Sequence, residues 1–157
     1  MSNPTQKFTN ARLMAVQAVY AKELSADSWE KIMSRFLMGE IGGQVIKDGI
    51  AGREEFIPLE QADAQLFTNL VHAVQENNEH LSQTIRENIS KNIDYDRLEF
   101  LAKCILKVGL AEFMVNPTLD IPIIINEYTD MARSFFDGSE TAIINAMLDK
   151  YGKIIRE

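Results

Sequence analysis

The 157-residue sequence has little cysteine, no long apolar run and no excess of positive charge. Its single cysteine, Cys104, excludes an internal disulfide framework and fits a reducing cytosol. No stretch approaches the roughly 18 consecutive apolar residues of a membrane span, and the first six residues are polar, unlike a signal peptide. We therefore expect a soluble cytoplasmic protein that does not enter a membrane.

The balance of charge argues against a protein that coats nucleic acid non-specifically. The sequence has 16 Lys and Arg against 23 Asp and Glu, which gives a net charge of −7. Residues 1–22 are an exception, because they contain Lys7, Arg12 and Lys22 and no acidic side chain. Any nucleic-acid contact is therefore expected to be local, and this first segment is the candidate for it.

Apolar residues recur at spacings of three and four almost throughout, which predicts an all-α fold. A chain of this length suits one compact domain. About seven helices are expected, over residues 10–24, 28–39, 66–77, 81–89, 94–114, 120–137 and 139–151. The expected capping residues are Asn10, Ser28, Asp120 and Ser139. The expected core includes Leu13, Tyr20, Leu66, Leu70, Ile105, Ile125 and Leu148.

Residues 39–58 differ from the rest of the chain, because they hold five of its eight glycines and end at Pro58. Such a composition predicts a long loop. Within it, a short hairpin around residues 45–56 is a further element that the pattern permits.

The ionisable residues offer few arrangements that could perform chemistry. His72, Glu76 and His80 recur every four residues, but the weak helix formers Asn77 and Asn78 predict a break between them, so we interpret them as solvated and expect no metal.

Three further residues lie in apolar segments. Cys104 is interpreted as a buried structural thiol. Glu112 and Glu127 are an acid–base pair on one interpretation and carboxylates that cap helix starts on the commoner one. Because no nucleophile, base and orienting group occur together, we expect neither enzymatic activity nor a cofactor.

Four segments resemble the helix signatures of the NusB family. They are residues 11–20 (ARLMAVQAVY), 105–113 (ILKVGLAEF), 121–127 (IPIIINE) and 145–150 (NAMLDK), and they run in order over nearly the whole chain outside the glycine-rich segment. The resemblance implies a single NusB-like domain over residues 1–157, built of two small helical bundles. The N-terminal subdomain would span about 1–77, with the loop at 39–58, and the C-terminal subdomain about 78–157.

The resemblance also implies a function. A member of this family would bind boxA-type RNA together with a NusE-like ribosomal protein. It would thereby modulate elongation by RNA polymerase on ribosomal RNA operons as a transcription antitermination or termination factor. The RNA-binding positions carried over from the family are Lys7, Arg12, Gln17, Ser139 and Ile143, and the protein-partner face is carried over to Tyr20 and Asp96.

The sequence departs from the family pattern at both RNA-binding segments. Phe8, Thr9 and Asn10 stand where an arginine cluster is usual, and Ala142 and Ile143 stand where a lysine and an aromatic residue are common. We therefore expect the chain alone to bind RNA weakly. The alternative is a helical scaffold or homodimer that keeps the protein partner but not specific RNA binding.

Overall fold

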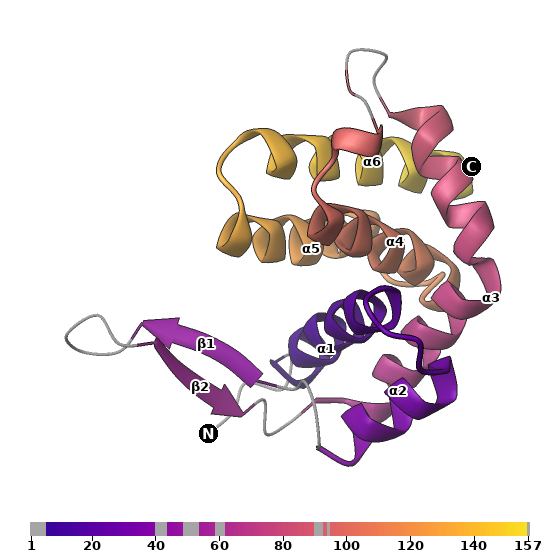
Figure 1. Ribbon diagram of the computed structural model, residues 1–157. Coiled ribbons are helices and arrows are strands. Elements are labelled where there is room, and N and C mark those ends of the chain that lie inside the picture. Colours follow the sequence, from indigo (N-terminus) through magenta and orange to yellow (C-terminus); the bar gives the residue numbers. More distant parts are fainter. Residues whose placement is uncertain are drawn as a thin grey trace. The chain divides into compact units, whose positions relative to one another are not determined.

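The computed structural model describes residues 6–39, 44–48, 54–58, 62–89, 93 and 95–156. These residues are almost entirely helical, which confirms the predicted all-α fold class (Figure 1). In chain order the elements are α1 (Gln6–Glu23), α2 (Trp29–Leu37), β1 (Gln44–Asp48), β2 (Glu54–Pro58), α3 (Ala64–Asn88), the short 3-10 helix η2 (Tyr95–Arg97), α4 (Phe100–Val115), α5 (Ile121–Phe135) and α6 (Ser139–Arg156).

The chain divides into two compact units. Unit 1 comprises residues 1–68 and holds α1, α2, the two strands and the first residues of α3. Unit 2 comprises residues 69–157 and holds the rest of α3 together with η2, α4, α5 and α6. Each unit therefore has its own set of helices.

The helix ends of unit 1 follow local chemistry, with one correction. Ser28 caps α2 as predicted, since its Oγ accepts a hydrogen bond from the Lys31 N–H at 3.1 Å. Gly39 follows α2 with a φ of +75°, a conformation that glycine adopts without strain. Asn10, however, is no cap: α1 begins at Gln6, whose side-chain amide donates to Asn10 Oδ1 at 2.9 Å inside the helix.

The glycine-rich segment contains the hairpin that its composition permitted. Strands β1 and β2 pair antiparallel, with Gln44 opposite Pro58 and Asp48 opposite Glu54 (Figure 1). The remainder of the predicted loop, at residues 40–43 and 49–53, lies outside the described residues. Among the described residues, this two-stranded ribbon is the only regular structure that is not helical.

Two of the predicted helices form one. Helix α3 runs from Ala64 to Asn88, and the predicted break at Asn77 is a kink, with φ −120° and ψ 17°. The Asn77 side-chain amide donates to the Ala73 carbonyl at 2.8 Å, so it competes with the backbone N–H groups that normally bond to carbonyls of the preceding turn. The described residues accordingly form six α-helices instead of seven.

The helix predicted over residues 94–114 begins later than expected. Residues 95–97 form η2, and α4 starts only at Phe100. Leu98 lies between them and is buried. The apolar periodicity therefore continues upstream of the helix itself, which explains why the sequence pattern extended the helix too far.

Two glycines let the three helices α4, α5 and α6 approach closely in unit 2, where they lie side by side (Figure 1). A Cβ at Gly109 of α4 would lie 3.0 Å from Leu148 Cδ2 on α6 and 3.3 Å from Tyr128 Cγ on α5. A Cβ at Gly152 of α6 would lie 2.9 Å from the Phe113 ring. Any larger residue would push these helices apart.

Most of the predicted core is buried. Five predicted core residues have exposed fractions below a tenth: Leu66, Leu70, Ile105, Ile125 and Leu148. Leu13 is half-buried. Tyr20 was predicted wrongly as a core residue, because 37% of its surface is exposed. Cys104 is buried, in agreement with its interpretation as a structural thiol.

A buried carboxylate joins α4 to α5. Glu112 is completely buried, and its carboxylate accepts hydrogen bonds from the Tyr128 hydroxyl at 2.6 Å and the Asn116 side-chain amide at 3.0 Å. Glu112 lies in the last turns of α4, and both of these donors are side chains instead of the backbone amides of a helix start. Glu127, its predicted counterpart, is half-buried on α5.

We predict that Tyr128→Phe lowers the free energy of unfolding by about 1–3 kcal/mol, because it removes a donor from a buried carboxylate. Urea unfolding followed by circular dichroism measures the change. Tyr151→Phe is the control, since burial raises the pKa of Tyr151 but its hydroxyl has no hydrogen bond to a described residue. Equal effects of the two substitutions would show that the Glu112 contact contributes nothing.

Candidate nucleic-acid and protein interfaces

The start of α1 presents a cation and an aromatic ring to solvent. Lys7 is exposed, 37% of the surface of Phe8 is exposed, and Lys7 Nζ lies 5.1 Å from the centre of the Phe8 ring. An ammonium group can pair with a phosphate, and an aromatic face can stack on an unpaired base. This pair therefore offers both kinds of contact that a single-stranded RNA requires.

The other two predicted RNA-binding residues of α1 are less accessible. Arg12 is only 5% exposed, and Gln17 is half-buried. A guanidinium so deeply placed offers little surface to a phosphate, so Lys7 is the stronger candidate for that contact. Phe8 is a residue that the sequence reasoning missed, although an aromatic residue directly after Lys7 was a visible signal.

The predicted RNA-binding residues of unit 2 lie in the first turns of α6. Ser139 is exposed, but it lies inside the helix and is not its cap, because the first intrahelical bond runs from the Ala142 N–H to the Gly138 carbonyl at 3.0 Å. Its hydroxyl donates to the Glu140 carboxylate at 3.0 Å. Ile143 is half-buried. The carboxylate beside Ser139 repels phosphate, so this segment suits RNA less well than the start of α1 does.

The two residues predicted to meet a protein partner are both accessible. Tyr20 is 37% exposed on α1 in unit 1, and Asp96 is exposed on η2 in unit 2. A partly exposed tyrosine is typical of protein interfaces, and an exposed carboxylate attracts a basic partner. Each residue is therefore placed where a partner could reach it.

A second cationic group, which the sequence reasoning missed, surrounds Tyr95 in η2. Arg86 Cζ lies 4.7 Å from the centre of the Tyr95 ring, and Lys103 Nζ lies 4.4 Å from it. Each such contact contributes roughly 0.5–1 kcal/mol at an exposed site. The three residues come from α3, η2 and α4 and have no fixed spacing in the sequence, so no sequence motif predicts that they meet.

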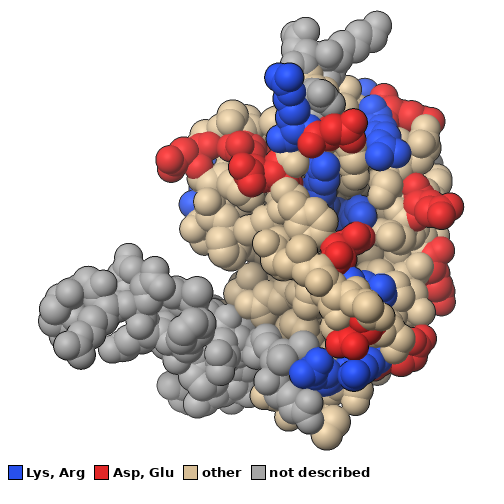
Figure 2. Space-filling model, viewed as in Figure 1, with Lys and Arg blue, Asp and Glu red and all other residues tan. Residues whose placement is uncertain are grey.

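Elsewhere, cations and carboxylates alternate over the surface. On the face in Figure 2, Lys and Arg side chains are interspersed with Asp and Glu and form no continuous basic patch. Several cations have acidic partners, such as Lys153 with Asp149 at 3.0 Å. In unit 1, Lys31 lies 3.2 Å from Asp27, and its hydrogen bond lowers the pKa of that carboxyl. Such pairs leave little net attraction for RNA.

Neither the histidine pattern nor the helices indicate a metal site or a membrane span in the described part of the chain. His72, Glu76 and His80 are exposed on either side of the Asn77 kink, and no three described residues are grouped as metal ligands would be. None of the helices in the described part of the chain has the length and apolarity that crossing a membrane requires.

Comparison with known proteins gives consistent matches over nearly the full chain. A transcription antitermination protein NusB from Rhodospirillum rubrum is 32% identical over 153 residues, covering 93% of this chain and 83% of that protein. The corresponding protein of Caulobacter vibrioides is 30% identical over 155 residues, covering 99% of this chain and 98% of that protein.

Solved structures share the fold. A crystal structure of the antitermination factors NusB and NusE in complex with dsRNA contains a chain that matches with a TM-score of 0.68 at 16% identity, covering 93% of this chain and 96% of that one. NusB from T. maritima matches with a TM-score of 0.66 at 16% identity, covering 98% and 93%. The profile of the NusB family itself matches residues 9–153, and the chain therefore belongs to the NusB family.

Proposed function

We propose that this chain is a transcription antitermination factor that binds RNA together with a NusE-like ribosomal protein and catalyses no reaction. The observation that carries the proposal is the match to the NusB family over residues 9–153, nearly the whole chain. The fold it shares with a NusB that was crystallised with NusE and dsRNA supports the same function.

The finer proposal concerns the RNA and the machinery. The RNA is of the boxA type, and the complex with the ribosomal protein acts in the cytoplasm on RNA polymerase as it elongates ribosomal RNA transcripts. Because the chain carries a net charge of −7, the basic ribosomal protein would supply much of the attraction for RNA. The chain itself would then position the RNA and hold its partner.

The proposed RNA contacts differ in how exposed each residue is and in which part of the RNA it can bind. Lys7 pairs with a phosphate and Phe8 stacks on a base, since both are exposed at the start of α1. Among the other positions carried over from the family, Arg12 is buried, so little of its side chain can contact RNA. Gln17, Ser139 and Ile143 offer smaller polar or apolar contacts.

The proposed partner contacts are Tyr20 and Asp96. Tyr20 offers a large apolar ring with a polar end, and Asp96 offers a negative charge to a basic ribosomal protein. These contacts require no chemistry from the chain, which agrees with a binding protein.

The second candidate is a scaffold, monomeric or dimeric, that keeps the protein partner and has lost specific RNA binding. The burial of Arg12 and the carboxylate of Glu140 beside Ser139 favour it. Purification of the chain with the ribosomal protein of the same organism, followed by titration of boxA RNA at two salt concentrations, separates the two. Tight binding of both partners supports the first proposal, and binding of the protein alone supports the second.

We predict that the chain alone binds boxA RNA weakly and with a shallow salt dependence. One phosphate contact on a single strand, at Lys7, gives a slope of log affinity against log salt near about −0.7. Filter binding over a range of salt measures the slope. A much steeper slope would reveal a basic surface that the described residues do not show.

We predict that Lys7→Gln reduces the magnitude of the salt slope of the complex by about 0.7, and that Phe8→Ala weakens RNA binding by about tenfold or more. Lys31→Gln, a change of an exposed cation on α2 in the same unit, is the control and should leave both quantities unchanged. If Lys31→Gln has the same effect as Lys7→Gln, the contact is only a general electrostatic one.

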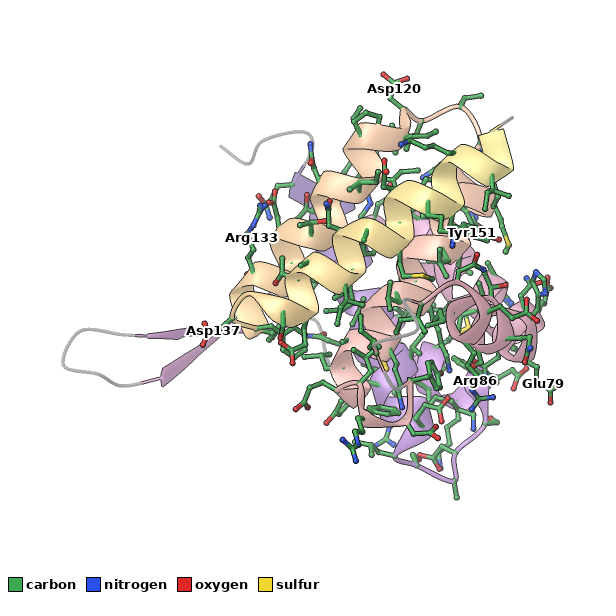
Figure 3. All side chains as sticks on the ribbon, turned by 90° about the horizontal axis from the view of Figure 1, so that it is seen from above. Glu79, Arg86, Asp120, Arg133, Asp137 and Tyr151 are labelled. Atoms are coloured by element: carbon green, nitrogen blue, oxygen red, sulfur yellow. The ribbon has the colours of Figure 1, made fainter. Side chains whose placement is uncertain are left out.

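We predict that Asp96→Lys together with Tyr20→Ala weakens binding of the ribosomal protein by at least tenfold and leaves helicity unchanged. Calorimetry measures the affinity, and circular dichroism measures the helicity. Asp137→Lys, at an exposed carboxylate between α5 and α6, is the control for net charge (Figure 3). Unchanged affinity in the double variant would show that the partner face lies elsewhere.

A further inference from the structure

Two cations from different helices meet at one aromatic ring in unit 2. Tyr95 is half-buried in η2, with Arg86 from α3 and Lys103 from α4 held against its ring at 4.7 and 4.4 Å from the ring centre. We call these three residues the Tyr95 cluster. The ring holds both cations in place, so the positive charge of the cluster is fixed in position before any ligand binds.

The two cations of the Tyr95 cluster are not held by ion pairs within the described part of the chain. Neither Arg86 nor Lys103 forms an ion pair with a described carboxylate, unlike Arg133 and Lys153 elsewhere in unit 2. The two charges cannot lie farther apart than the sum of their distances to the ring centre. That limit is within the roughly 10 Å over which salt at 0.1 M screens charges. They therefore repel each other, and an anion beside both would be attracted by both.

The surroundings of the cluster favour a single carboxylate over an RNA backbone. Asp96 follows Tyr95 in the sequence, Glu87 follows Arg86, and Glu99 lies one helical turn before Lys103. All three carboxylates are exposed. A run of phosphates along this surface would approach these carboxylates as well as the cations. A folded protein surface carries charges of both signs, so it can present an acidic group to the cations and a basic group to Asp96.

We propose that the Tyr95 cluster binds an acidic side chain of the NusE-like ribosomal protein, next to the contact at Asp96. This inference rests on the proposed function, and it adds a second contact of opposite sign to the partner face. Neighbouring contacts of opposite sign fix the orientation of a partner, because a partner turned the wrong way would bring like charges together.

The test compares two double variants of the full chain that remove the same amount of charge. Arg86→Gln with Lys103→Gln removes the cluster. Arg133→Gln with Lys153→Gln removes two cations elsewhere in unit 2, and Figure 3 shows Arg133 and Arg86 on opposite sides of this unit. Calorimetry with the ribosomal protein of the same organism measures the affinity of each.

We expect the cluster variant to bind the ribosomal protein at least tenfold more weakly than the wild type. The control variant should bind equally or slightly more tightly, because a more acidic chain attracts a basic partner. Arg86→Lys should retain most of the affinity. Tyr95→Leu, which keeps both cations but removes the ring that holds them, should weaken binding by about threefold. Circular dichroism verifies that each variant is folded.

A charge exchange identifies the acidic group itself. Arg86→Glu with Lys103→Glu should abolish binding of the wild-type ribosomal protein. Replacement of one of the partner's Asp or Glu residues by Lys should restore it. If no single replacement does so, the cluster does not bind a carboxylate of this partner.

Three other outcomes would overturn the inference in distinguishable ways. If the wild type binds the ribosomal protein and the cluster and control variants do so equally, only this inference fails. If, in addition, the cluster variant alone loses affinity for RNA in the ternary complex, the anion is a phosphate. If the wild type does not bind the ribosomal protein, the proposed function fails together with this inference.

Discussion

The hydrogen bond between the Tyr128 hydroxyl and the Glu112 carboxylate is the constraint on which unit 2 depends. A carboxylate removed from water needs donors, and here α5 provides Tyr128 at 2.6 Å while Asn116, the residue that follows α4, donates at 3.0 Å. Gly109, one turn earlier on the same face of α4, leaves room for the Tyr128 ring. A glycine that admits the ring and a glutamate that accepts its hydroxyl thus fix the register of α5 against α4.

The same face of α4 also positions α6. Leu148 packs against Gly109, and Gly152 packs against the Phe113 ring, so residues of α4 determine where both following helices lie. The start of α4 meanwhile carries Lys103, one of the cations at Tyr95. A single helix therefore organises the core at one end and contributes to a surface site at the other, which lets a small unit hold a surface charge in a defined place.

The sequence predicted which segments are helical better than where they begin and end. Periodicity identified the helices because burial of an apolar face produces it. Leu98, however, is buried outside a helix, so the predicted start of α4 lay too early in the chain. The side chain of Asn77 produced a kink in α3 where its low helix propensity had predicted an end. Tyr20 fits the apolar spacing of α1 and is nevertheless exposed, since periodicity does not distinguish a buried side chain from one that stays at the surface.

The candidate site was harder to predict, because its chemistry depends on contacts between segments. Lys7 could be found from the charge of residues 1–22, whereas the burial of Arg12 is visible only in the folded chain. Tyr95 and its two cations are separated along the sequence and meet only after α3 and α4 are placed. In an acidic chain, a few cations held in position contribute more to specificity than to overall attraction, since the net charge still opposes a polyanion. The proposed function follows the same division, with the basic partner supplying attraction and this chain supplying orientation.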